Sequence, residues 1–129
     1  MANSRELKFR AWDRIACIMW QVDEICFNDG YGNTYANPGL EYTGIQDRDN
    51  RSKRAGHEIE LMQFTGLLDK KGKEIYEGDI FNITVEPEEI NQVVFYGGRW
   101  MLVRHGLDLM EWHDEGEVIG NIYEGLVEQ

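Results

Sequence analysis

The sequence predicts a mainly β chain with little helix, and three observations lead to this prediction. Apolar and polar residues alternate in several short runs, as they do in strands with one buried face. The steps Gly78-Asp79 and Gly97-Gly98 separate some of these runs, as in tight turns. Helical spacing of apolar residues is almost absent. With 129 residues, of which 42% are hydrophobic, the chain is long enough to bury a real core.

Residues 1–56 are expected to form an N-terminal β-hairpin followed by a long irregular loop. Residues 7–12 alternate apolar with charged side chains, and a second strand-like run extends from Ile18 to about Phe27. Asp13 is expected to begin the turn between these two runs. Residues 28–56 are crowded with turn residues, so we predict a long loop that serves as a linker or as a binding surface.

Residues 57–129 are predicted to form a second domain, a small barrel or rolled sheet of about five strands. The strongest hairpin signal is Gly97-Gly98, which lies between an apolar run at 92–96 and another at 100–103. The segment 117–123 is expected to be the last strand. One turn of helix is expected within residues 106–113 and another at the C-terminus.

The charge is unevenly distributed along the chain. The net charge is −11, yet residues 1–56 contain 8 basic and 8 acidic residues, so residues 57–129, with 5 basic and 16 acidic residues, account for all of it. An acidic surface repels phosphates and anionic lipid heads, so nucleic acid and membranes are not expected as partners. No apolar run approaches the length of a membrane-spanning helix. A cytoplasmic protein is therefore expected, with Cys17 and Cys26 reduced and buried as small core residues.

Three blocks of the sequence resemble the YopX family of bacteriophage proteins. They are the opening run Leu7–Asp13, the central block Leu61–Ile80 and the closing block Glu117–Glu124, which occur in this order and frame nearly the whole chain. The resemblance implies a phage or prophage gene expressed in a bacterial host cell. It also implies a small SH3-like barrel in the second half and an N-terminal part that contributes to self-association, hence a homo-oligomer. No biochemical activity and no catalytic residue come with the family.

The residues of this resemblance are expected to be structural. Gly78 is predicted to need an unusual backbone geometry, Asp79 to cap the turn by accepting backbone N–H bonds, and Gly120 to mark a bulge or a close backbone approach. The full set of these signature residues is Thr65, Gly66, Leu67, Asp69, Gly72, Ile75, Tyr76, Gly78, Asp79, Gly120, Asn121 and Tyr123.

No pattern in the sequence predicts a catalytic site, a metal site or a cofactor. The three histidines match no metal-ligand spacing, so His113 and its acidic neighbours are expected to be solvated loop residues. Basic residues near tyrosines are typical of binding surfaces, and one such cluster falls in the long loop. This candidate interaction loop consists of Tyr31, Tyr35, Tyr42, Arg48, Arg51, Lys53 and Arg54.

Three functions remain open from the sequence. The first is a non-enzymatic protein-interaction module that self-associates and binds an unknown host or phage protein. The second is a small β-barrel that binds nucleic acid through the basic loop. The third is an acidic mimic that occupies a host DNA-binding protein, which the net charge of −11 permits.

Overall fold

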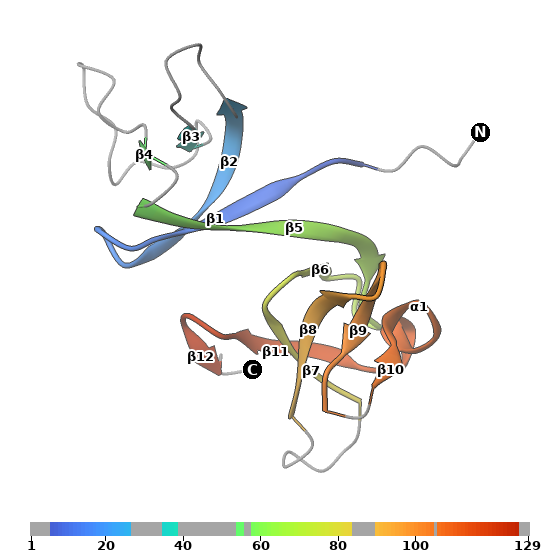
Figure 1. Cartoon of the computed structure of the whole chain (residues 1–129). Coiled ribbons are helices and arrows are strands. Elements are labelled where there is room, and N and C mark those ends of the chain that lie inside the picture. Colours follow the sequence, from blue (N-terminus) through green and yellow to red (C-terminus); the bar gives the residue numbers. More distant parts are fainter. Residues whose placement is uncertain are drawn as a thin grey trace. The chain divides into compact units, whose positions relative to one another are not determined.

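A computed structural model of the chain describes residues 6–26, 35–38, 54–55, 58–83, 90–104 and 106–126 (Figure 1). Within this part the protein is mainly β, with one short helix, which confirms the predicted fold class. The chain divides into two compact units. The first contains Lys8–Met62, and the second contains Gln63–Gln129 together with the first residues up to Leu7. The sequence predicted a boundary between residues 56 and 57, whereas the two units meet in the chain between Met62 and Gln63.

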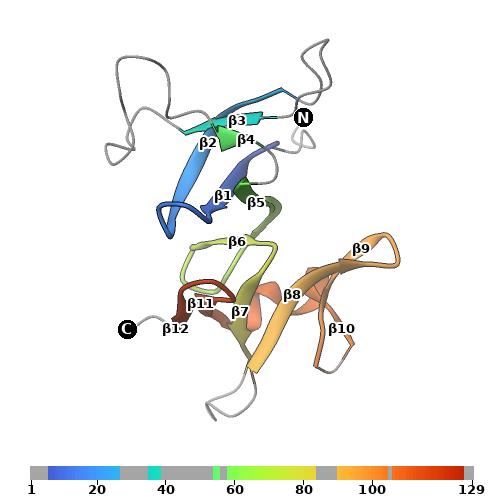
Figure 2. The same ribbon diagram turned by 60° about the vertical axis from the view of Figure 1, so that its left-hand side comes forward.

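Two six-stranded antiparallel sheets contain all strands of the described residues, and one of the sheets curls into a half-barrel. One sheet has the order β4-β3-β2-β1-β5-β6 and the other β10-β9-β8-β7-β11-β12 (Figures 1 and 2). The strands are β1 (Phe9–Asp13), β2 (Ile18–Cys26), β3 (Tyr35–Pro38), β4 (Arg54–Ala55), β5 (Ile59–Leu68), β6 (Glu74–Tyr76), β7 (Asp79–Asn82), β8 (Ile90–Tyr96), β9 (Arg99–Leu102), β10 (Leu107–Asp108), β11 (Glu117–Asn121) and β12 (Gly125–Leu126). The helix is α1 (Leu109–Trp112), and a 3₁₀ turn, His113–Glu115, follows it.

The predicted N-terminal hairpin is confirmed by the pairing of β1 with β2, in which Asp13 lies opposite Ile18. The Asp13 side chain is buried and organises the turn. One carboxylate oxygen, Oδ1, accepts hydrogen bonds from the backbone N–H groups of Ile15 and Ala16, each at 2.9 Å. Oδ2 accepts a bond from the indole Nε1–H of Trp20 at 3.1 Å. The carboxylate therefore ties the turn to the core, because a buried carboxylate is stable only when its oxygens are hydrogen-bonded.

The prediction for Cys17 was wrong. Its side chain is exposed rather than buried, and its backbone has a φ of 59°, in the left-handed region. The turn places the residue there because the tight connection between β1 and β2 needs one positive φ, and the sequence offers no glycine at this point. The side chain of Cys26 is not among the described groups.

The first unit has a small core formed by buried side chains from three strands. Ala11, Trp20 and Ile59 are at most 4% exposed, and partly buried side chains of β2 and β5 pack against them. Trp20 is the largest of these three buried side chains.

The long loop predicted for residues 28–56 contains two short strands. Strand β3 pairs with β2, and β4 pairs with β3, so the first sheet extends beyond the hairpin. Strands β3 and β4 are too short to show an apolar-polar alternation in the sequence. They form because they pair with neighbouring strands, which local sequence patterns do not reveal. The other residues of the predicted loop lie outside the described part.

The second unit is built around a larger core, and residues 57–129 contain strands β5 to β12 rather than the roughly five strands expected. Its fully buried side chains come from β6, β7, β8, β9 and α1, joined by Val118 of β11 at 5% exposure. They are Ile75, Phe81, Val93, Leu102 and Leu109. Strands around one shared core are what a small rolled sheet requires. The turn of helix expected within residues 106–113 is α1. The helical turn expected at the C-terminus is not found in the described residues, where Gly125–Leu126 form β12.

The hairpin predicted at Gly97-Gly98 is confirmed by the pairing of β8 with β9. Phe95 lies opposite Trp100, and Tyr96 lies opposite Arg99. Gly97 and Gly98 have φ values of 64° and 83°. Two successive positive φ values define the two-residue turn that matches the twist of the strands, and glycine adopts them without strain.

Within the described residues, no helix has the length and the apolar character needed to cross a membrane.

Candidate docking surface

The signature residues between positions 65 and 79 belong to the second unit and are held in it by buried polar groups. Asp69 is 5% exposed, and its Oδ1 accepts hydrogen bonds from the N–H groups of Lys71 and Lys73, each at 2.9 Å. Its Oδ2 accepts one from the N–H of Val118 at 2.9 Å. The Gly72 N–H also donates to the Asp69 carbonyl at 2.9 Å. Asp69 thus holds its own turn and ties it to β11.

A second turn, between β6 and β7, has the geometry expected from the sequence. Gly78 has a φ of 87°, and the buried Asp79 accepts a hydrogen bond from the N–H of Tyr76 at 2.7 Å. The Gly78 N–H donates to the carbonyl of Val93 at 2.9 Å. Only glycine adopts this φ easily while its backbone lies so close to a neighbouring strand. Ile75 and Tyr76, two of the signature residues expected to be structural, are buried.

A bulge interrupts β5 at Thr65–Leu67. The hydroxyl of Thr65 donates to the carbonyl of Ile75 at 2.8 Å and accepts from the N–H of Leu67 at 3.2 Å. The register of the β5–β6 pair shifts between Phe64 and Leu68. Gly66 is therefore exposed at the surface, while Leu67 packs against the core.

The expectation that residues 117–123 form the last strand was wrong, because β11 ends at Asn121 and a turn leads into one more strand, β12. The register of β11 against β7 shifts between Val118 and Gly120, which confirms the bulge predicted there. The Asn121 Oδ1 accepts hydrogen bonds from the N–H groups of Tyr123 and Glu124 at 3.0 and 2.8 Å. The two signature residues Asn121 and Tyr123 are therefore part of a hydrogen-bonded turn.

Gly116 is a structural residue that the sequence reasoning missed. A Cβ added there would lie 2.3 Å from the carbonyl oxygen of Asn82 and 2.7 Å from Cε2 of Phe81. Its own carbonyl accepts a hydrogen bond from the N–H of Lys70 at 3.0 Å. The surrounding sequence, an acidic stretch without strand pattern, contains no signal for this close approach, because it depends on a partner strand far along the chain.

The candidate interaction loop is largely outside the described residues. Tyr35 and Arg54 belong to β3 and β4, where Ala36 pairs with Arg54. The remaining members, Tyr31, Tyr42, Arg48, Arg51 and Lys53, lie in the undescribed segments.

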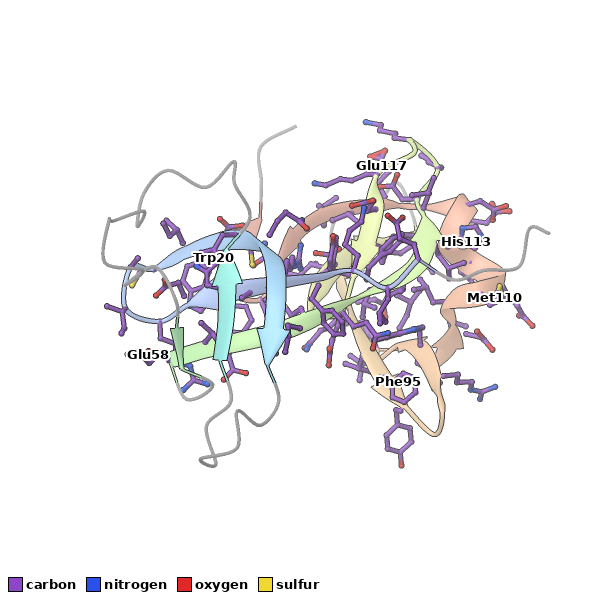
Figure 3. The ribbon with its side chains drawn as sticks, turned by 90° about the horizontal axis from the view of Figure 1, so that it is seen from above. Trp20, Glu58, Phe95, Met110, His113 and Glu117 are labelled. Carbon is purple, nitrogen blue, oxygen red and sulfur yellow. The ribbon has the colours of Figure 1, made fainter. Side chains whose placement is uncertain are left out.

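A different surface of the second unit carries several exposed large apolar side chains. On the β8–β9 hairpin, Phe95 is 56% and Tyr96 73% exposed. Val103, just after β9, is 56% exposed, and Met110 of α1 is 66% exposed. Figure 3 shows Phe95 and Met110 directed outward from the ribbon. Exposed apolar residues are common singly, but several together on one unit are typical of an interaction site.

Two hollows flank this hairpin and share Phe95. The first has a volume of about 460 Å³ and is lined by Val94, Phe95, Tyr96, Met101, Val103 and Gly106. The second, which we call the hairpin groove, has a volume of about 540 Å³. Its walls are the β5 bulge, the hairpin and the start of α1, with Thr65, Leu67, Phe95, Trp100, Asp108 and Met110 among its residues.

The wall of the hairpin groove is fixed by local contacts. The Phe95 ring contacts the Trp100 ring edge-on, with centroids 4.9 Å apart. Asp108 caps α1 by accepting a hydrogen bond from the N–H of Met110 at 2.9 Å. The three consecutive apolar residues Val94, Phe95 and Tyr96 were a sequence signal for this surface, because a strand cannot bury all three on one face.

The acidic neighbours of His113 are exposed, as expected, and His113 itself is partly exposed in the 3₁₀ turn. Its Nδ1 lies 2.7 Å from the carbonyl oxygen of Leu68. The ring therefore connects the end of α1 to the end of β5. Among the described residues, no group of three or more His, Cys, Asp and Glu side chains could hold a metal ion.

The YopX protein family profile matches residues 8–125, most of the chain. A crystal structure described as protein EF1440 from Enterococcus faecalis has a similar fold, with a TM-score of 0.67 and 24% sequence identity. The similarity covers 94% of this chain and 96% of that one, so both units belong to the shared fold. No curated protein matches the sequence. Neither description states an activity.

Proposed function

Because this chain belongs to the YopX family, whose name describes no chemistry, we propose its function from its surface: a non-enzymatic protein-interaction module encoded by a phage or prophage. The observation that supports this proposal is the exposed apolar surface around Phe95, with its two hollows. Association buries such surface, and aromatic side chains in a central position supply much of the affinity.

The hairpin groove suits a protein partner in its size and composition. Its volume of about 540 Å³ holds one or two large side chains, and its apolar members lie beside exposed backbone and polar groups. Phe95 and Trp100 support one another at 4.9 Å, so the wall is formed before a partner binds. A preformed wall reduces the entropy lost on binding.

The test is affinity capture by the full chain from bacterial lysate, with and without nuclease treatment. The groove variant carries Phe95→Ser and Met110→Ser. The control variant carries Ile15→Ser, which removes an equally exposed apolar side chain from the β1–β2 turn. We expect wild type and control to capture the same specific protein and the groove variant to lose it.

Equal capture by the groove variant would reject this surface as the site of interaction. Capture that disappears on nuclease treatment would favour the alternative in which the basic loop binds nucleic acid. Recovery of the chain alone would favour a role limited to self-association.

A further inference from the structure

The hairpin groove has one basic side chain among its lining residues, and that charge is already balanced. Nη1 of Arg99 lies 3.5 Å from Oδ2 of Asp108 at the rim of the groove. The side chains are 60% and 29% exposed. An exposed pair of this kind contributes little stability, but it cancels the positive charge that the groove would otherwise present.

The helical wall of the groove continues into an acidic segment. Met110 lines the groove, and the acidic residues Glu111, Asp114 and Glu115 follow it, all three exposed. The only potentially basic side chain in this helical segment is His113, and its Nδ1 is engaged with the Leu68 carbonyl. The chain that leaves the groove at Met110 therefore carries three exposed carboxylates within the next five residues.

The second half of the chain as a whole is also negatively charged. Residues 57–129 contain 16 acidic and 5 basic residues, and three of those basic residues lie together at positions 70–73. Lys70 and Lys71 are near Glu117, at 4.0 and 3.4 Å, which reduces their influence at a distance. The field around the second unit thus attracts cations and repels anions.

We propose that the hairpin groove binds a cationic protein segment that carries an apolar side chain beside lysine or arginine residues. This inference rests on the proposed interaction function and names the chemistry of the partner. The apolar side chain would occupy the space between Leu67, Phe95 and Met110, and the cations would face the carboxylates after Met110. Apolar burial supplies affinity, while complementary charge supplies association rate and selects against acidic partners.

The experiment measures the binding of three labelled peptides to the full chain by fluorescence polarisation. One peptide alternates Trp with Lys, the second alternates Trp with Glu, and the third alternates Ser with Lys. We expect the Trp–Lys peptide to bind about tenfold more tightly than each of the others, because only it offers both apolar anchor and complementary charge. Binding should weaken as the salt concentration rises.

Matched variants locate the binding site. Phe95→Ser with Met110→Ser should abolish selective binding of the Trp–Lys peptide. Glu111→Gln should weaken it about threefold at low salt, since one carboxylate near the groove is lost. Glu124→Gln is the control for net charge, because Glu124 lies on the β11–β12 turn and a glutamine oxygen can still accept the Asn121 hydrogen bond. It should leave binding unchanged.

Preferential binding of the Trp–Glu peptide, or of no peptide, would overturn the cationic partner. Equal weakening by Glu111→Gln and Glu124→Gln would also overturn it, since net charge alone would then explain the binding. Peptide binding that survives the Phe95 and Met110 changes would place the contact elsewhere. None of these outcomes decides the lysate capture, which tests the interaction function without assuming the partner's charge.

Discussion

The carboxylate of Asp69 accepts a hydrogen bond from the backbone N–H of Val118 at 2.9 Å, although 49 residues separate them in the sequence. The same side chain accepts bonds from Lys71 and Lys73 in its own turn. It thus serves local and long-range structure at once. This explains why an aspartate in an ordinary turn sequence is buried to 5% exposure.

Asp69→Asn is expected to lower the free energy of unfolding by about 2 kcal/mol, because an amide NH₂ replaces one acceptor and leaves a buried N–H unsatisfied. Urea denaturation followed by circular dichroism measures the change. Asp114→Asn, at an exposed position of the 3₁₀ turn, is the control and should shift stability by less than about 0.5 kcal/mol. Equal effects of both changes would show that the three hydrogen bonds of Asp69 are not important for stability.

Gly116→Ala is expected to destabilise the protein by about 2–3 kcal/mol, because the new Cβ would overlap the Asn82 carbonyl oxygen and the Phe81 ring. Thermal unfolding provides the measurement. Gly98→Ala is the comparison, since a Cβ there meets open space and the cost is the positive φ alone, about 1 kcal/mol. If Gly98→Ala proved the more harmful of the two, the close approach at Gly116 would be refuted.

Cys17→Gly is expected to be more stable than Cys17→Ala by about 1 kcal/mol. Both variants remove the sulfur atom, but only glycine adopts the φ of 59° without strain. Chemical denaturation monitored by tryptophan fluorescence compares the two. The exposed thiol of the unmodified protein should also react with a thiol reagent without prior unfolding. A thiol at Cys17 that reacts only after denaturation would contradict its exposed position.

Met110→Ser is expected to change the free energy of unfolding by less than about 0.5 kcal/mol, since the side chain is 66% exposed. Phe95→Ser should cost about 1 kcal/mol through loss of the ring contact with Trp100. Both variants should therefore remain folded by circular dichroism, which makes them suitable for binding tests. Unfolding of either variant would mean that the exposed apolar side chains are part of the core.

The sequence by itself determined the class of the fold and the position of its tight turns. The alternation in residues 7–12, the Gly97-Gly98 step and the Gly78-Asp79 step depend on local backbone preferences, so each was predictable from neighbouring residues. The apolar runs of the second half likewise predicted its core strands, because burial follows a period of two.

Only the tertiary structure decided the roles that depend on distant residues. The restriction at Gly116 comes from Asn82, the second function of Asp69 comes from Val118, and the short strands β3 and β4 exist by pairing. Sequence patterns indicate local periodicity, but they do not indicate which strands pair with one another. The hairpin groove has the same origin, because β5 is distant in the chain from the β8–β9 hairpin and α1 and belongs to the other sheet.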